Sequence, residues 1–224
     1  AGDTLYAAFD MIHGGYTQAA GQKVREGEAH GDMYEDKLGT YLVKISGCSL
    51  SDHDSLEVSK LLHIIGDLER LSDHAVNIAE SMEEMHDKEL HFSDTAKKEL
   101  ETICNAEREI IRLTVSALAE DNMENASLVE PLEQVVDSLK ARIKTRHIER
   151  LQKNECTIEL GFVLSDLLNN LERISDHCSN IAVYEIQVPK DEYDAHEYLQ
   201  NVKHQEHAEF DREEMAYEKS YRLP

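Results

Sequence analysis

The sequence predicts an all-α protein of six long antiparallel helices, arranged as two tandem three-helix repeats. Apolar residues recur at spacings of three and four along most of the 224 residues, and the chain has only three prolines and no tryptophan. In addition, residues 68–79 are repeated at residues 171–182, with Leu, Glu, Arg, Ser, Asp, His, Asn, Ile and Ala at the same places. A segment duplicated at a fixed offset is typical of two copies of one supersecondary unit.

The first half predicts three helices. One long helix is expected over residues 4–46, bent near its glycines, each of which costs up to ~1 kcal/mol relative to alanine. After a turn, Ser51 is a candidate N-cap for a helix over residues 54–87. Ser93 is the next candidate N-cap and opens a helix over residues 93–120. The pair Asp-Asn that follows is expected to end this helix.

The second half predicts three more helices. They are expected over residues 124–153, 156–187 and 191–220, with a short turn between the first two. Pro189 should separate the last two, because proline lacks an amide hydrogen and restricts the residue before it. We therefore expect a first repeat over residues 1–121 and a second over residues 122–224.

Composition limits the classes of partner. The formal net charge is −23, which argues against binding to a nucleic-acid backbone or an anionic membrane surface and favours cations, including divalent metals. The four cysteines are far apart and indicate neither a zinc finger nor a disulfide framework. No stretch is long and apolar enough to predict a transmembrane helix. The chain begins with alanine rather than methionine, which is consistent with a fragment of a longer protein.

Pairs of acidic residues are the candidate functional groups. Residues four apart share one face of a helix, and a single Glu-x-x-x-Asp pair is most often a solvated surface feature. Four such pairs, however, occupy matching places on the first two helices of each repeat, with offsets of 105 and 103 residues. If those helices pack side by side, their carboxylates converge, and crowded carboxylates are relieved by raised pKa values or by hard cations such as Mg, Ca, Mn or iron. The predicted metal ligands are Glu28, Asp32, Glu69, Asp73, Glu133, Asp137, Glu172 and Asp176.

The other polar patterns in the sequence give weaker indications of a site. A fifth pair, Glu83 and Asp87, has no counterpart in the second half. A ferritin-like di-iron site needs Glu-x-x-His on two helices, and that pattern occurs only once. His74 and His177 follow the aspartate of each duplicated segment and are candidates either for support of the carboxylates or for the edge of the core. No catalytic motif is present, so we expect no enzyme, and a metal-independent helical interaction module remains an alternative.

The duplicated segment L-E-R-x-S-D-H-x-x-N-I-A resembles the signature of the PhoU family, and the likeness extends over nearly the whole chain. The resemblance implies a PhoU-like bundle that holds metal ions on the eight acidic residues, with iron favoured and Mg, Mn, Zn, Ca and Ni as alternatives. It also implies a non-enzymatic role in regulating phosphate transport and homeostasis, with inorganic phosphate as a ligand of the metal.

The same resemblance suggests where the protein acts. The chain is most like the C-terminal domain of bacterial sodium/phosphate cotransporters, because of its acidic, tyrosine-rich tail at residues 216–221. This implies a cytoplasmic domain tethered to the inner membrane through a transporter domain. The alternative is a free-standing PhoU-type regulator of phosphate uptake. The expected partners are a membrane transporter domain, phosphate-signalling proteins or a second copy of the chain, and no nucleic acid.

Overall fold

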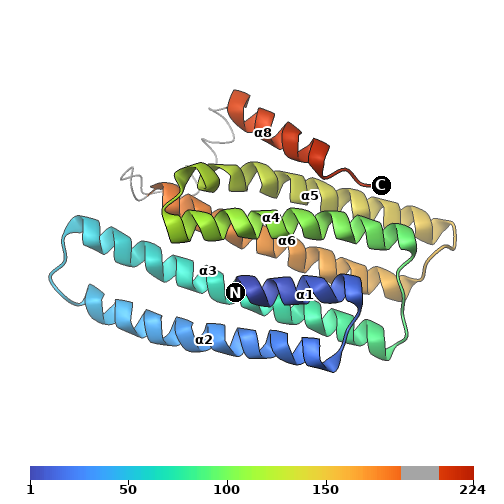
Figure 1. Cartoon of the computed structure of the whole chain (residues 1–224), viewed down its shortest axis with the longest axis horizontal. Coiled ribbons are helices and arrows are strands. Elements are labelled where there is room, and N and C mark those ends of the chain that lie inside the picture. The colour runs from blue at the N-terminus through green and yellow to red at the C-terminus, as the bar shows by residue number, and fades with distance from the viewer. Residues whose placement is uncertain (188–206) are drawn as a thin grey trace.

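The computed structural model describes residues 1–187 and 207–224, and within them every regular element is an α-helix (Figure 1). The predicted all-α class is therefore confirmed. The described helices are α1 (Gly2–Gly14), α2 (Gln18–Ser46), α3 (Asp52–Asp87), α4 (Asp94–Glu120), α5 (Met123–Gln152), α6 (Ile158–Gln187) and α8 (His207–Ser220).

Five of the described helices begin at a residue whose side-chain oxygen accepts a hydrogen bond from a backbone amide three residues later. This contact satisfies one of the amides that a helix start leaves without an intrahelical partner. The capping residues are Thr17, Ser51, Ser93, Asn122 and Thr157. The caps predicted at Ser51 and Ser93 are thus confirmed, and the break after α4 is completed by Asp121, whose φ of 50° lies in the left-handed region.

The single helix predicted over residues 4–46 is wrong. The chain breaks after Gly14, because Gly15 adopts a φ of 84° and a ψ of 162°, which no helix can contain. Thr17 then caps a new helix, so α1 and α2 form an antiparallel pair. The glycines farther along, which sequence alone suggested would bend the helix, lie inside a continuous α2.

The helices pack as two sets of three, and the two sets are joined where α3 contacts α6. Helices α1 and α2 pack on α3, helices α4 and α5 pack on α6, and α3 lies along α6, so that one hydrophobic core runs through both sets. Helix α8 lies on the outer side of α5 (Figure 1). The largest fully buried side chains include Leu5, Phe9, Ile64, Ile78, Leu100, Ile103, Ile110, Leu132, Leu139 and Ile143.

This packing bears on the expected repeats. Because α4 packs mainly on α5 and α6, the helices group as α1–α2–α3 and α4–α5–α6, and this favours a boundary between α3 and α4. The boundary expected at residues 121 and 122 stays a prediction. Pro189 and the first part of the helix expected over residues 191–220 lie outside the described residues, and α8 is the described part of that helix. None of the described helices has the length and apolarity needed to cross a bilayer.

Candidate functional site

The first carboxylate cluster lies between α2 and α3. Glu28 and Asp32 are one turn apart on α2, and Asp73 faces them from α3, so that one carboxylate oxygen of each lies within 4.8 Å of the others. The two helices approach closely because α2 has glycine at residue 31, where an added Cβ would lie 3.2 Å from the Ser72 hydroxyl. The structure therefore groups three of the four acids predicted on these two helices, and Glu69 is not a member of that group.

Crowding of negative charge perturbs this first cluster. The pKa of Glu28 is raised, first by partial burial and then by Asp32 and Asp73. The pKa of Glu69 is also raised, first by partial burial and then by Asp73, Asp32 and Glu35. Among the described ion pairs, no lysine or arginine neutralises any of the four predicted ligands of this cluster. A cation bound between the helices would remove this repulsion.

The second cluster contains an acidic residue that the sequence did not single out. Glu107 of α4 is fully buried, and neither of its carboxylate oxygens has a hydrogen-bond partner. Burial raises the pKa of Glu107 well above the usual glutamate range, and Asp176, Glu133 and Asp137 raise it further. Three of the four ligands predicted for this half thus lie close enough to Glu107 to perturb it, from two neighbouring helices.

A sequence signal for Glu107 was available. It lies four residues after Ile103 and three before Ile110, both fully buried, so it occupies the apolar stripe of α4. An acidic residue in such a stripe is rarely buried without a partner or a ligand.

The two clusters differ in whether basic side chains pair with their carboxylates. In the second half Glu172 forms an ion pair with Lys140 of α5, and Asp176 forms one with Arg173 at 3.0 Å. These pairs neutralise part of the charge that a metal would otherwise neutralise. In the first cluster, by contrast, one carboxylate oxygen each of Glu28, Asp32 and Asp73 lies in a single group. None of these three residues has a basic partner among the described ion pairs.

The two histidines of the duplicated segments join the halves of the molecule. His177 Nδ1 lies 2.8 Å from Asp67 Oδ1 in a buried contact, and His74 Nδ1 lies 2.8 Å from Asn170 Oδ1. Asp67 and Asn170 are 103 residues apart, which is also the offset between His74 and His177. The contact of His177 with Asp67 and the contact of His74 with Asn170 are therefore equivalent under the duplication. The rings stack with centroids 5.5 Å apart, which fixes α3 against α6.

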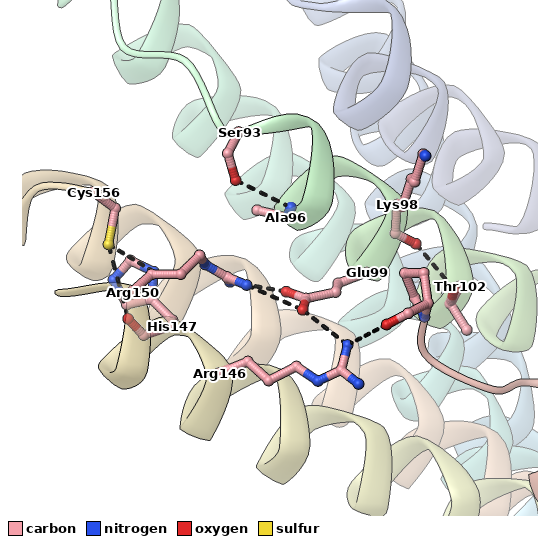
Figure 2. Close-up of polar contacts among 10 residues, drawn as sticks. Ser93, Ala96, Lys98, Glu99, Thr102, Arg146, His147, Arg150 and Cys156 are labelled. Carbon is pink, nitrogen blue, oxygen red and sulfur yellow. Dashed lines mark hydrogen bonds and ion pairs between the residues drawn. The ribbon is translucent and has the colours of Figure 1, made fainter. Parts of the chain in front are cut away.

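A third buried polar group lies at the far end of α4 and α5. Glu99 is fully buried, and Arg146 and Arg150 of α5 both contact its carboxylate, at 3.2 and 2.8 Å (Figure 2). Arg146 also donates a hydrogen bond of 2.7 Å to the backbone oxygen of Pro224, which ties the C-terminal residue to α5. Because both partners of Glu99 are cations, this group holds helices together and is not a candidate metal site.

Comparison with known proteins identifies the family. The PhoU domain model matches residues 1–82 and 100–184, which is more than half of the chain. The chain belongs to the PhoU family. The family resemblance drawn from the duplicated segment is confirmed, and all eight predicted ligands and Glu107 lie inside the matched stretches.

Two curated PhoU proteins are similar in sequence. The chain is 26% identical over 121 residues to the phosphate-specific transport system accessory protein PhoU homolog 1 of Thermotoga maritima, covering 54% of this chain and 51% of that protein. It is 27% identical over 128 residues to the corresponding PhoU homolog of Clostridium acetobutylicum, covering 57% of each. The match therefore spans a little over half the length of these relatives.

Solved PhoU structures share the fold. The crystal structure of PhoU from Pseudomonas aeruginosa superposes with a TM-score of 0.79 at 19% identity, covering 85% of this chain and 90% of that one. The phosphate transport system regulatory protein PhoU from Streptococcus pneumoniae gives a TM-score of 0.71 at 14% identity, covering 85% and 88%. At these identities the likeness establishes the fold alone.

Proposed function

We propose that this PhoU-family protein is a regulator of phosphate transport that is not an enzyme and that binds metal ions at its carboxylate clusters. Membership of the family and the names of the curated relatives, which are accessory proteins of phosphate-specific transport systems, support the regulatory role. The observation that carries the metal-binding part is the grouping of Glu28, Asp32 and Asp73 within 4.8 Å.

In this proposal the carboxylates hold the ions and supply no catalysis. Glu28, Asp32, Glu69 and Asp73 form the first site. The second consists of Glu133, Asp137, Glu172 and Asp176, with Glu107 buried near three of them. Carboxylate oxygens suit hard cations, and iron is the metal that the family resemblance favours, with Mg, Mn, Zn, Ca and Ni as alternatives. A bound cation would offset the repulsion that raises the pKa of Glu28 and Glu69 and would offer a positive centre to inorganic phosphate.

The comparisons support a PhoU-type regulator of phosphate uptake better than a cotransporter domain. The two curated relatives are named as accessory proteins of phosphate-specific transport systems, and the Streptococcus pneumoniae structure is named as a phosphate transport system regulatory protein. The cotransporter context, the tether to an inner membrane and the homodimer stay predictions. Transporter components and phosphate-signalling proteins are the partners that we propose.

The metal-binding part is tested on protein purified without a His tag or chelator. Elemental analysis followed by titration with Fe, Mn and Zn measures content and affinity. Because Asp32 and Asp73 come from facing helices, Asp32→Asn with Asp73→Asn should weaken binding at the first site by at least about tenfold. Asp87→Asn is the matched control, since its acidic pair has no counterpart in the other half, and it should leave metal content unchanged.

The regulatory part is tested separately, in the source cells. Deletion of the gene should alter phosphate uptake, and the wild-type gene should restore it. Unchanged uptake after deletion would contradict the regulatory role whatever the metal content.

A metal-independent interaction module is the second candidate function. The ion pairs of Lys140 with Glu172 and of Arg173 with Asp176 favour it, because they neutralise acids of the second cluster without a metal. This candidate predicts no metal after purification, none on titration, and the same melting temperature for wild type and for Asp32→Asn with Asp73→Asn. That result would remove metal binding and leave the family role intact.

A further inference from the structure

A cavity lies between α5 and α6, close to the turn that joins these two helices. Its volume is about 290 Å³. An apolar cavity of about 150 Å³ holds one benzene molecule, so this one suits an apolar ligand of about ten to twelve non-hydrogen atoms. Most of the side chains that line it are apolar, namely Ile148, Leu151, Ile158, Phe162, Leu164 and Leu168.

The duplication shows that the first half of the molecule has different residues at the equivalent place. With the offsets of 103 and 105 residues, Gly161 and His147 correspond to Val58 and Leu42, which are both buried. Gly161 has no side chain, and a Cβ added to it would lie 2.8 Å from His147 Nε2. The second half therefore has a glycine and an imidazole where the first half has two packed apolar side chains.

The opening of the cavity also differs between the halves. Ile158 and Phe162 are 67% and 69% exposed and line the cavity from α6. They correspond to Ser55 and Ser59 of α3. The cavity of the second half thus has an apolar opening where the first half has two hydroxyl groups.

The end of the cavity away from the turn is polar. Helices α5 and α6 are antiparallel (Figure 1), and His147 lies against Gly161. Lys144, three residues before His147, is therefore level with Ser165, four residues after Gly161, and both line the cavity. Within residues 1–187 and 207–224, neither Lys144 nor Ser165 takes part in a hydrogen bond or an ion pair.

His147 offers a further polar atom to a ligand. It is only 6% exposed, and its Nε2 has no hydrogen-bond partner among the described residues, whereas its Nδ1 lies 3.8 Å from Cys156 Sγ (Figure 2). Burial lowers the pKa of His147, and Arg150 lowers it further, so that Lys144 is the cation of the cavity lining near neutral pH. A buried polar atom without a partner is costly, and a polar group of a ligand would supply that partner.

We propose that this cavity binds a medium-chain monocarboxylate, with its alkyl chain among the apolar side chains and its carboxylate at Lys144, Ser165 and His147. The net charge of −23 disfavours anions over the molecule as a whole, so an anion is selected here through the local cation. The inference is independent of metal binding and of the role in phosphate transport.

The test compares three ligands that share one alkyl chain and differ in the charge of the head group. The full chain is titrated near neutral pH with octanoate, 1-octanol and octylammonium, and binding is measured by calorimetry. Octanoate should bind with a dissociation constant below about 1 mM and at least about tenfold more tightly than octylammonium, with 1-octanol between them. Octylammonium binding as tightly as octanoate would overturn the proposal, and so would the absence of octanoate binding.

A charge variant tests the role of Lys144. Because Lys144 is exposed, Lys144→Gln should leave the fold intact, weaken octanoate binding by at least about fivefold and leave the affinity for 1-octanol unchanged. Lys153→Gln, at an exposed position at the end of α5 that does not line the cavity, is the matched control and should bind octanoate as the wild type does. Equal octanoate affinity in Lys144→Gln and wild type would contradict the proposed head-group site.

A second variant fills the cavity with the pair of residues found in the first half. His147→Leu with Gly161→Val copies Leu42 and Val58, and it should remove the binding of both octanoate and 1-octanol. A melting temperature at or above that of the wild type would show that the variant is folded. Octanoate binding that survives in the folded variant would place the ligand elsewhere and overturn the proposal.

Discussion

At the scale of single residues, three buried glutamates show how differently a carboxylate can be accommodated. Glu99 is paired with two arginines and Glu185 with Lys60 at 3.5 Å, whereas among the described ion pairs Glu107 has no basic partner and three acids raise its pKa further. Removing one member of a buried ion pair leaves an uncompensated charge, so Glu99 is a structural group. Glu107 has no such cation within the described residues, and a ligand that neutralises Asp176, Glu133 and Asp137 would lower the cost of its burial.

Glu185 gives a prediction about pH. Burial raises its pKa, and Lys60 offsets this only in part. The folded state therefore retains the proton to a higher pH than the unfolded state, and stability falls as pH rises from the ordinary glutamate range through the raised pKa. In Glu185→Gln this loss is absent. The free energy of unfolding of the wild type relative to the variant should decrease from about pH 4 toward neutral pH.

Urea denaturation at a series of pH values measures this difference. Glu101→Gln, at an exposed position of α4, is the control and should show no such trend. A difference between wild type and Glu185→Gln that is constant with pH would show that Lys60 fully compensates the buried carboxylate.

At the scale of helices, glycines decide how closely α2 approaches its neighbours. The sequence suggested that the glycines near Glu28 loosen the helix. In the structure α2 is continuous there, and Gly27 lies against α1, where an added Cβ would be 2.4 Å from the hydroxyl oxygen of Thr4. Gly31 faces Ser72 of α3 in the same way. The glycines thus allow the close packing that places Glu28 and Asp32 beside α3.

Alanine substitutions in α2 test this role. Gly27→Ala should destabilise the protein by about 1–3 kcal/mol, because Thr4 is buried and must move. Gly39→Ala on the same helix is the matched control, since nothing lies within 4 Å of the added Cβ, and it should stabilise by about 0.5–1 kcal/mol. Chemical denaturation measures both. Equal stabilisation by the two substitutions would mean that α1 does not pack tightly on α2.

At the scale of the whole molecule, the net negative charge opposes folding, and the core shared by the two duplicated halves favours it. The net charge of −23 favours expansion of the chain, and the core shared by both sets of helices opposes it. The histidine contacts between α3 and α6 connect the two sets. Cations that bind the folded state should therefore stabilise the molecule more than salt that merely screens its charges.

Melting temperatures separate these two effects. Raising NaCl from about 0.01 M to about 0.2 M should raise the melting temperature of the wild type and of Asp32→Asn with Asp73→Asn, because both remain strongly acidic. Addition of about 1 mM Mn²⁺ at the higher salt should raise it further in the wild type and less in the double variant. Equal responses to Mn²⁺ would place the bound ions outside the first cluster.

Much of the fold followed from local patterns. Helices α3 to α6 begin and end within about two residues of the predicted limits, because caps and periodicity act within one or two turns. The break between α1 and α2 was missed although Gly14, Gly15 and the cap at Thr17 marked it in the sequence. Apolar periodicity on both sides obscured a turn of three residues.

The sequence by itself determined the helices, the duplication and the face on which each acidic pair lies, since these depend on spacing along one helix. Only the tertiary structure decided that Glu28, Asp32 and Asp73 meet, that Glu107 is buried near Asp176, Glu133 and Asp137, and that Lys140 is paired with Glu172. It also decided that His74 and His177 contact opposite halves. The physical reason is that contacts between helices depend on their rotation and separation, which are set by side-chain packing over the whole core and not by the spacing within any one helix.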